Sequence, residues 1–202
     1  GGRCGTGPAE GAWLLPSSLS SGPGAPVDLP PAAGNRTGHA ALVEPSSGAI
    51  WLIGGLTSSK TAAPDLRVSP DLTTVQPLGG FGAPARSLGM PCPGTATALV
   101  FGSLAADQPF HLLWEADLDA GEVTPVTTSG LSPLPRDGFG IAAAPAGIVL
   151  YGGRTPDGEV RGDLWVYELD HHEWTLLGEG GPLRTDPLLA VIGDWLLLTG
   201  GF

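Results

Sequence analysis

Residues 148–153 read Ile-Val-Leu-Tyr-Gly-Gly, a short apolar run that ends in two glycines. An almost continuous apolar run of this length is typical of a strand that is buried on both faces. Glycine suits positions where backbones crowd or where φ turns positive, so we expect the strand to end at the pair. This stretch decides the fold because copies of it recur along the chain.

The copies occupy four places in the sequence: residues 50–55, 98–102, 148–153 and 196–201. Their first glycines are 48, 50 and 48 residues apart. The double-glycine positions are Gly54, Gly55, Gly152, Gly153, Gly200 and Gly201. An arginine precedes each copy, and the four are Arg36, Arg86, Arg136 and Arg184. Two markers that recur in step indicate an internal repeat of about 49 residues.

A third marker follows the glycines, because residues 113–124 align without a gap on residues 164–175. The aromatic residues at repeat positions are expected to pack within each unit: Trp114, Trp165, Tyr167 and Trp174. Each unit is predicted to contain four strands, which in the third unit lie near 138–143, 147–152, 163–169 and 173–178. Proline and glycine interrupt every longer helical period, so we expect essentially no helix.

The Arg-x-Gly-His at 36–39, the run into a double glycine, Asp163-Leu164-Trp165, and a Tyr followed seven residues later by Trp together resemble the Kelch repeat. The resemblance covers about residues 36–202 and implies an all-β fold of four-stranded blades arranged radially as a β-propeller. Individual positions depart from the pattern. Ser103 replaces the second glycine and Ala116 replaces the Tyr of the second unit, while the fourth unit stops at Phe202.

The division of the chain follows from the repeat. Residues 1–35 are interpreted as the fourth strand of a preceding blade, at 12–15, followed by a Pro/Gly/Ser-rich mobile linker. Residues 36–202 form the Kelch-like propeller, with units that start near 36, 86, 136 and 184. About four blades are present, either as an arc cut from a six- or seven-bladed ring or as a small four-bladed ring closed by the Trp13 strand.

Composition and missing motifs exclude several kinds of activity. The formal net charge of −11 argues against nucleic-acid binding, and no apolar run is long enough to span a bilayer. Nucleophile elbows, phosphate loops and His-Glu-x-x-His are absent, and the two tyrosines do not match an oxidase copper site. We therefore expect no catalysis, no cofactor and no metal, and read His171-His172 as an exposed turn. Pairing of Cys4 with Cys92 stays open.

The loops separate into two sets, which in an up-and-down blade lie on opposite faces. The links between strands 2 and 3 and between blades are long, and they carry seven of the nine basic residues. Long loops on a rigid scaffold are where binding residues usually lie. The candidate partner-binding residues on this long-loop face are Lys60, Asp107, Arg154, Asp157, Glu159 and Arg161. The repeated arginines are instead expected to brace their blades by pairing with a neighbouring carboxylate such as Asp137 or Asp186.

These observations predict a non-enzymatic protein–protein interaction scaffold that binds a protein or peptide on the long-loop face, without membrane insertion, and with a cytoplasmic location. One alternative is an accessory propeller domain of a larger enzyme, such as a methyltransferase or oxidase. Another is an extracellular adhesion or receptor module, which rests on the glycosylation pattern Asn35-Arg36-Thr37.

Overall fold

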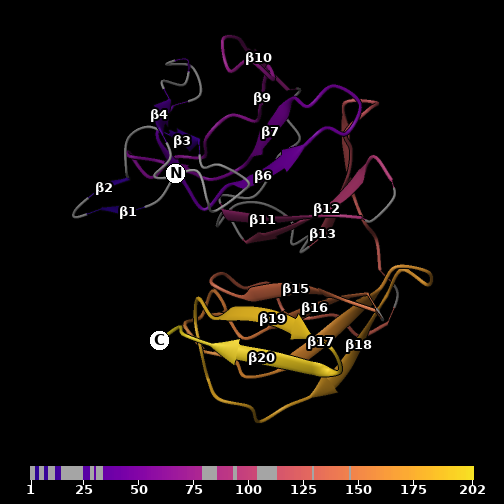
Figure 1. Cartoon of the computed structure of the whole chain (residues 1–202). Helices are drawn as coiled ribbons and strands as arrows, with labels where there is room; N and C mark the ends of the chain where they lie inside the picture. Colours follow the sequence, from indigo (N-terminus) through magenta and orange to yellow (C-terminus); the bar gives the residue numbers. More distant parts are fainter. Residues whose placement is uncertain are drawn as a thin grey trace. The chain divides into compact units, whose positions relative to one another are not determined.

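The computed structural model describes residues 3–4, 7–8, 12–14, 25–27, 30, 34–78, 86–92, 95–103, 113–128, 130–145 and 147–202. Over these residues the chain is all-β, with strands and no helix (Figure 1). The expectation of an all-β chain is confirmed. The chain divides into two compact units: unit 1 contains 1–98 and 117–122, and unit 2 contains 99–116 and 123–202.

The N-terminal part contains short strand pairs. β1 (Arg3–Cys4) pairs with β2 (Gly7–Pro8), and β3 (Ala12–Leu14) pairs with β4 (Ala25–Val27). β3 is the strand that the sequence assigned to a preceding blade, and its partner β4 lies inside the stretch that was expected to be a loop. β5 (Arg36–Thr37) pairs with β8 (Leu56–Thr57) across the end of the first apolar run.

Three four-stranded sheets then follow in chain order, each with its strands arranged as a meander. The first contains β6 (Ala40–Val43), β7 (Ile50–Ile53), β9 (Leu66–Val68) and β10 (Val75–Pro77). The second contains β11 (Arg86–Pro91), β12 (Thr97–Ser103), β13 (Leu113–Asp117) and β14 (Glu122–Pro125). The third contains β15 (Gly140–Ala144), β16 (Gly147–Tyr151), β17 (Leu164–Glu168) and β18 (Glu173–Gly178).

The fourth repeat is a two-stranded hairpin of β19 (Leu188–Ile192) and β20 (Trp195–Thr199). The four strands predicted for the third repeat are found in the predicted order, as neighbours in one antiparallel sheet. Their ends differ from the prediction by one or two residues, which is ordinary at strand termini where the last backbone pairs fray.

The double glycines end the second strand of a repeat for a steric reason. Gly152 and Gly153 have φ values of 66° and 95°, a region that residues with a Cβ rarely adopt. A Cβ on Gly152 would lie 2.6 Å from the Arg184 carbonyl oxygen, and one on Gly153 would lie 2.7 Å from that of Asp137. The chain therefore turns here while two other backbone segments, at Asp137 and Arg184, pass close by.

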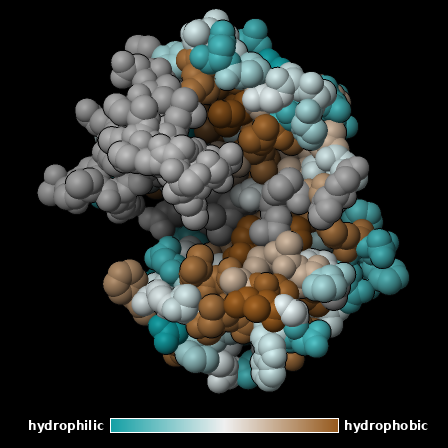
Figure 2. Space-filling model, in the orientation of Figure 1, coloured by the Kyte–Doolittle hydropathy of each residue, from teal (hydrophilic) through white to brown (hydrophobic). Residues whose placement is uncertain are grey.

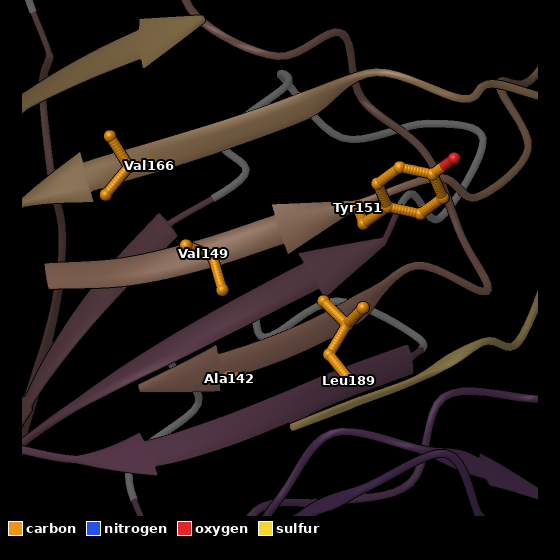
Figure 3. Close-up of a cluster of buried hydrophobic side chains, with 5 residues drawn as sticks. All are labelled: Ala142, Val149, Tyr151, Val166 and Leu189. Atoms are coloured by element: carbon orange, nitrogen blue, oxygen red, sulfur yellow. The ribbon is translucent and has the colours of Figure 1, made fainter. Parts of the chain in front are cut away.

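One buried cluster lies between the third sheet and the hairpin of the fourth repeat. In unit 2, β15 packs against β19, and Ala142, Val149, Tyr151 and Val166 form a buried cluster with Leu189 (Figure 3). In unit 1, β6 packs against β11 in the same way. Gly89 of β11 lies so close to β6 that a Cβ would meet Leu42 at 2.9 Å.

Candidate functional site

Three of the repeated arginines, Arg36, Arg136 and Arg184, donate hydrogen bonds to carbonyl oxygens at the ends of the apolar runs. Arg136 is only 1% exposed, and its guanidinium donates to the Gly152 carbonyl at 3.1 Å and to both carboxylate oxygens of Asp163. Trp165 Nε1 donates to the same carboxylate at 2.8 Å. Burial acts to raise the pKa of Asp163, but the hydrogen bonds from Arg136 and Trp165 outweigh it and lower that pKa.

The same bond recurs in two other repeats. Arg36 donates to the Gly54 carbonyl at 3.3 Å, and Arg184 donates to the Gly200 carbonyl at 2.8 Å. Burial lowers the pKa of Arg36, with the charge of Asp65 acting in the opposite direction. The side chain of Arg86 lies outside the described residues. These arginines join the start of a repeat to the end of its second strand, which is a structural role.

The carboxylate that holds Arg136 differs from the one suggested by the sequence. Sequence proximity indicated a neighbour such as Asp137, but the partner is Asp163, at the start of the third strand. Likewise, Arg184 donates to the Gly200 carbonyl, where proximity had suggested Asp186. The pairing follows strand order in the sheet, because β17 lies beside β16 and brings Asp163 to the double glycine.

The candidate partner-binding residues of the third repeat share one tightly bonded loop, residues 154–161. Arg154 exchanges two backbone hydrogen bonds with Asp137, at 2.7 and 2.9 Å, and its side chain is exposed. The Thr155 hydroxyl donates to Asp157, and Arg161 forms an ion pair with Glu159 at 3.1 Å. The loop therefore has a fixed backbone and an exposed rim that carries both signs of charge.

The two other candidates are separate from this loop. Lys60 is exposed in unit 1, in a turn where its amide donates to the Thr57 carbonyl at 2.9 Å and its φ is 61°. Asp107 lies outside the described residues. The structure therefore brings together four of the six candidates, namely Arg154, Asp157, Glu159 and Arg161.

A groove lies beside this loop in unit 2, with a volume of about 580 Å³. It is formed by residues 126–128 and 132–135, by residues 155–157, and by the starts of β13 and β18. Its apolar lining comprises Leu113, Val126, Pro133, Leu134, Pro135, Pro156 and Trp174. Its polar lining comprises Thr127, Thr128, Ser132, Thr155 and Asp157. Sequence reasoning missed the groove, although the Pro-Leu-Pro at 133–135 in a long link was an available signal.

Trp174 forms part of the groove wall and also packs in the sheet. Its ring meets Tyr167 at a centroid distance of 5.2 Å and Phe101 at 6.0 Å in an edge arrangement. Trp114 and Trp165 are buried as well. The groove therefore has one aromatic wall residue, Trp174, which is packed against two other rings.

The two histidines of the 171–172 turn form hydrogen bonds with residues of their own sheet. His172 Nδ1 bonds the Tyr167 hydroxyl at 3.0 Å, and His171 bonds Glu168 at the same distance. The hydrogen bond with Glu168 raises the pKa of His171. Among the described residues, no group of three or more His, Cys, Asp or Glu side chains is arranged to hold a metal ion.

Three sequence features bear on the cellular location of the protein: the glycosylation pattern at Asn35, the two cysteines, and the length of its apolar segments. Asn35 of the glycosylation pattern is exposed. Cys92 is half-buried, and the side chain of Cys4 lies outside the described residues, so their pairing stays open. Within the described part of the chain, no helix is long and apolar enough to cross a membrane.

Comparison with known proteins adds no relative: no protein-family model and no curated protein matches the chain.

Proposed function

We propose that this chain is a non-enzymatic interaction module of Kelch-like propeller architecture, and that it binds an extended segment of another protein in the groove of unit 2. The groove beside the 154–161 loop is the observation that carries the proposal. Its lining is mainly apolar, which suits the side chains of a peptide, and its polar groups are hydroxyls and one carboxylate, which suit the peptide backbone and a basic residue.

The propeller part of the proposal is supported by packing between successive repeats. In a propeller, the first strands of neighbouring blades lie side by side around the axis. β6 contacts β11 and β15 contacts β19, each pair within one unit, and these contacts between first strands support a radial arrangement of the repeats. The bond from arginine to the first glycine carbonyl gives the first, third and fourth repeats the same internal brace.

The binding part is supported by rigidity and charge. The loop at 154–161 is held by backbone hydrogen bonds, two within the loop, one to Gly153 and two to Asp137. Little ordering is therefore required when a partner binds. Its exposed rim offers Arg154 on one side and Asp157 at the groove, which suits a partner segment of mixed charge.

The test is selection of peptides from a random library on the immobilised full chain, followed by affinity measurement of the selected peptides in solution. Leu134→Glu places a charge in the apolar lining, and Thr128→Trp fills the groove. Both are expected to weaken binding at least about tenfold, as loss of a central contact does. Leu177→Glu is the matched control, because Leu177 is an exposed leucine of unit 2 outside the groove. Selected peptides that bind both groove variants as well as the control would refute the proposal.

A further inference from the structure

The groove of unit 2 has a single ionisable side chain among its described lining residues, the carboxylate of Asp157. The other side chains of the lining are apolar or carry hydroxyl groups. The hydroxyl of Thr155, which is buried, donates to Oδ1 of Asp157, and this hydrogen bond lowers the pKa of the carboxyl below its usual value. The groove therefore holds a carboxylate that stays ionised at neutral pH beside apolar walls.

The backbone of the loop fixes the position of this carboxylate. The amide of Thr155 donates to the Glu159 carbonyl at 2.9 Å, and the amide of Gly158 donates to the Thr155 carbonyl at the same distance. Gly158 has a φ of 95°, which residues with a Cβ rarely adopt, so the turn depends on glycine. A group held in this way requires little reordering when it meets a ligand.

No basic side chain among the described residues forms an ion pair with Asp157. The charge of Arg161 contributes to the lowered pKa of Asp157, but the guanidinium itself pairs with Glu159 at 3.1 Å. Arg136 is buried and pairs with Asp163. The carboxylate of Asp157 is therefore available to a basic group that a ligand brings into the groove.

This carboxylate makes the groove selective. A segment that fills the groove removes water from Asp157, and an ionised carboxylate that loses water without gaining a partner is unfavourable. A neutral or acidic residue beside Asp157 therefore weakens binding, whereas a lysine or arginine replaces the lost hydrogen bonds with charge-assisted ones. The apolar lining, which includes Leu134, Pro156 and Trp174, favours apolar residues next to the basic one.

Apolar residues alone do not select the groove, because unit 2 has a second apolar surface. The outer side of the β19–β20 hairpin exposes Leu188, Ile192 and Trp195, and Figure 2 shows hydrophobic atoms gathered where Figure 1 draws this hairpin. A test of the groove must therefore separate peptides that bind in it from peptides that bind to the hairpin.

We infer that the segment bound in the groove carries a lysine or arginine next to apolar residues, and that this basic side chain pairs with Asp157. The inference rests on the proposed function, because it names the kind of segment that the groove binds. Arg154 directly precedes the groove residues 155–157 and has an exposed side chain, which suits an acidic residue of the same segment outside the groove. The net charge of −11 attracts any basic segment, but this attraction is not specific to the groove.

The experiment selects peptides from a random library on the immobilised full chain and keeps those whose affinity falls with Thr128→Trp, an uncharged change that fills the groove. Each selected peptide is compared in solution with a matched peptide in which its lysine or arginine is replaced by glutamine. The glutamine peptide is expected to bind the wild type about five- to tenfold more weakly. With Asp157→Asn, the two peptides are expected to bind equally, because the partner charge is gone. Circular dichroism checks that each variant keeps the wild-type fold.

Asp170→Asn is the matched control, because it removes the same charge from an exposed turn of unit 2 outside the groove lining. It is expected to keep the preference for the basic peptide. Groove-binding peptides that lack a basic residue would overturn the inference, as would a preference that survives Asp157→Asn or is lost equally with Asp170→Asn; each of these results leaves the proposed function standing. If no selected peptide responds to Thr128→Trp, the proposed function fails and the inference fails with it.

Discussion

The pair of Arg136 and Asp163 is expected to be the most sensitive polar contact in unit 2. Asp163→Asn keeps the shape of the side chain and its acceptor for Trp165, but leaves the guanidinium of Arg136 buried without a counter-charge. The Arg136 side chain is 0% exposed and that of Asp163 is 9% exposed, so water cannot replace the lost partner. Breaking a buried ion pair on one side costs about 3–5 kcal/mol, and we expect a loss in this range.

The assay is equilibrium unfolding in urea, followed by tryptophan fluorescence. The double variant Arg136→Met with Asp163→Asn removes both charges, and is expected to be less destabilised than the sum of the two single variants. Glu159→Gln is the control, because its pair with Arg161 is exposed and such pairs contribute only about 0–1 kcal/mol. An Asp163→Asn variant that loses no more stability than Glu159→Gln would show that the brace does not stabilise the repeat.

Two further predictions concern charge. Reversal of Arg154 and Arg161 to Glu is expected to weaken binding of an acidic peptide selected on the chain, with a smaller effect at high salt because salt screens the attraction. Asp170→Lys, in the turn at the opposite end of the strands, is the control and is expected to leave binding unchanged. Titration of the peptide at two salt concentrations measures both effects, and an equal effect of Asp170→Lys would place the site on the other face. Hydrogen bonds from Arg67 lower the pKa of Glu44 from 4.5 to about 2, so the stability that this ionised carboxylate contributes is present above pH 4.5 and lost as the pH falls toward 2. Glu44→Gln is therefore expected to be less stable than the wild type at pH 7, and the difference in free energy of unfolding is expected to be smaller at pH 3. Urea titrations at the two pH values measure this, and a difference that stays constant would contradict it.

The β-strands and their order could be predicted from the sequence because they depend on local features. An apolar run such as 148–151 needs burial on both faces, and a double glycine ends it because φ turns positive there. Trp114 and Trp165 were recognised as packing residues because they occupy the same position in two repeats, and both are buried. Each of these features is contained within a few consecutive residues, so the sequence alone determined it.

The candidate site depended on contacts that no local pattern contains. Asp163 reaches Arg136 across 27 residues because β17 pairs beside β16, and the register of β17 with β18 shifts at Leu164 and Trp165. The groove forms only because residues 126–128 and 132–135 lie beside residues 155–157, which follow the next pair of strands in the chain.

The hairpin at 188–199 shows the same limit most clearly. Its sequence is apolar at nearly every position, so alternation cannot tell which face is buried. The tertiary structure decided this by packing Leu189 and Leu198 on the third sheet, which leaves Leu188 and Trp195 in solvent. The physical reason is that burial is a property of the neighbouring sheet, whereas a strand's own residues determine only that it is a strand.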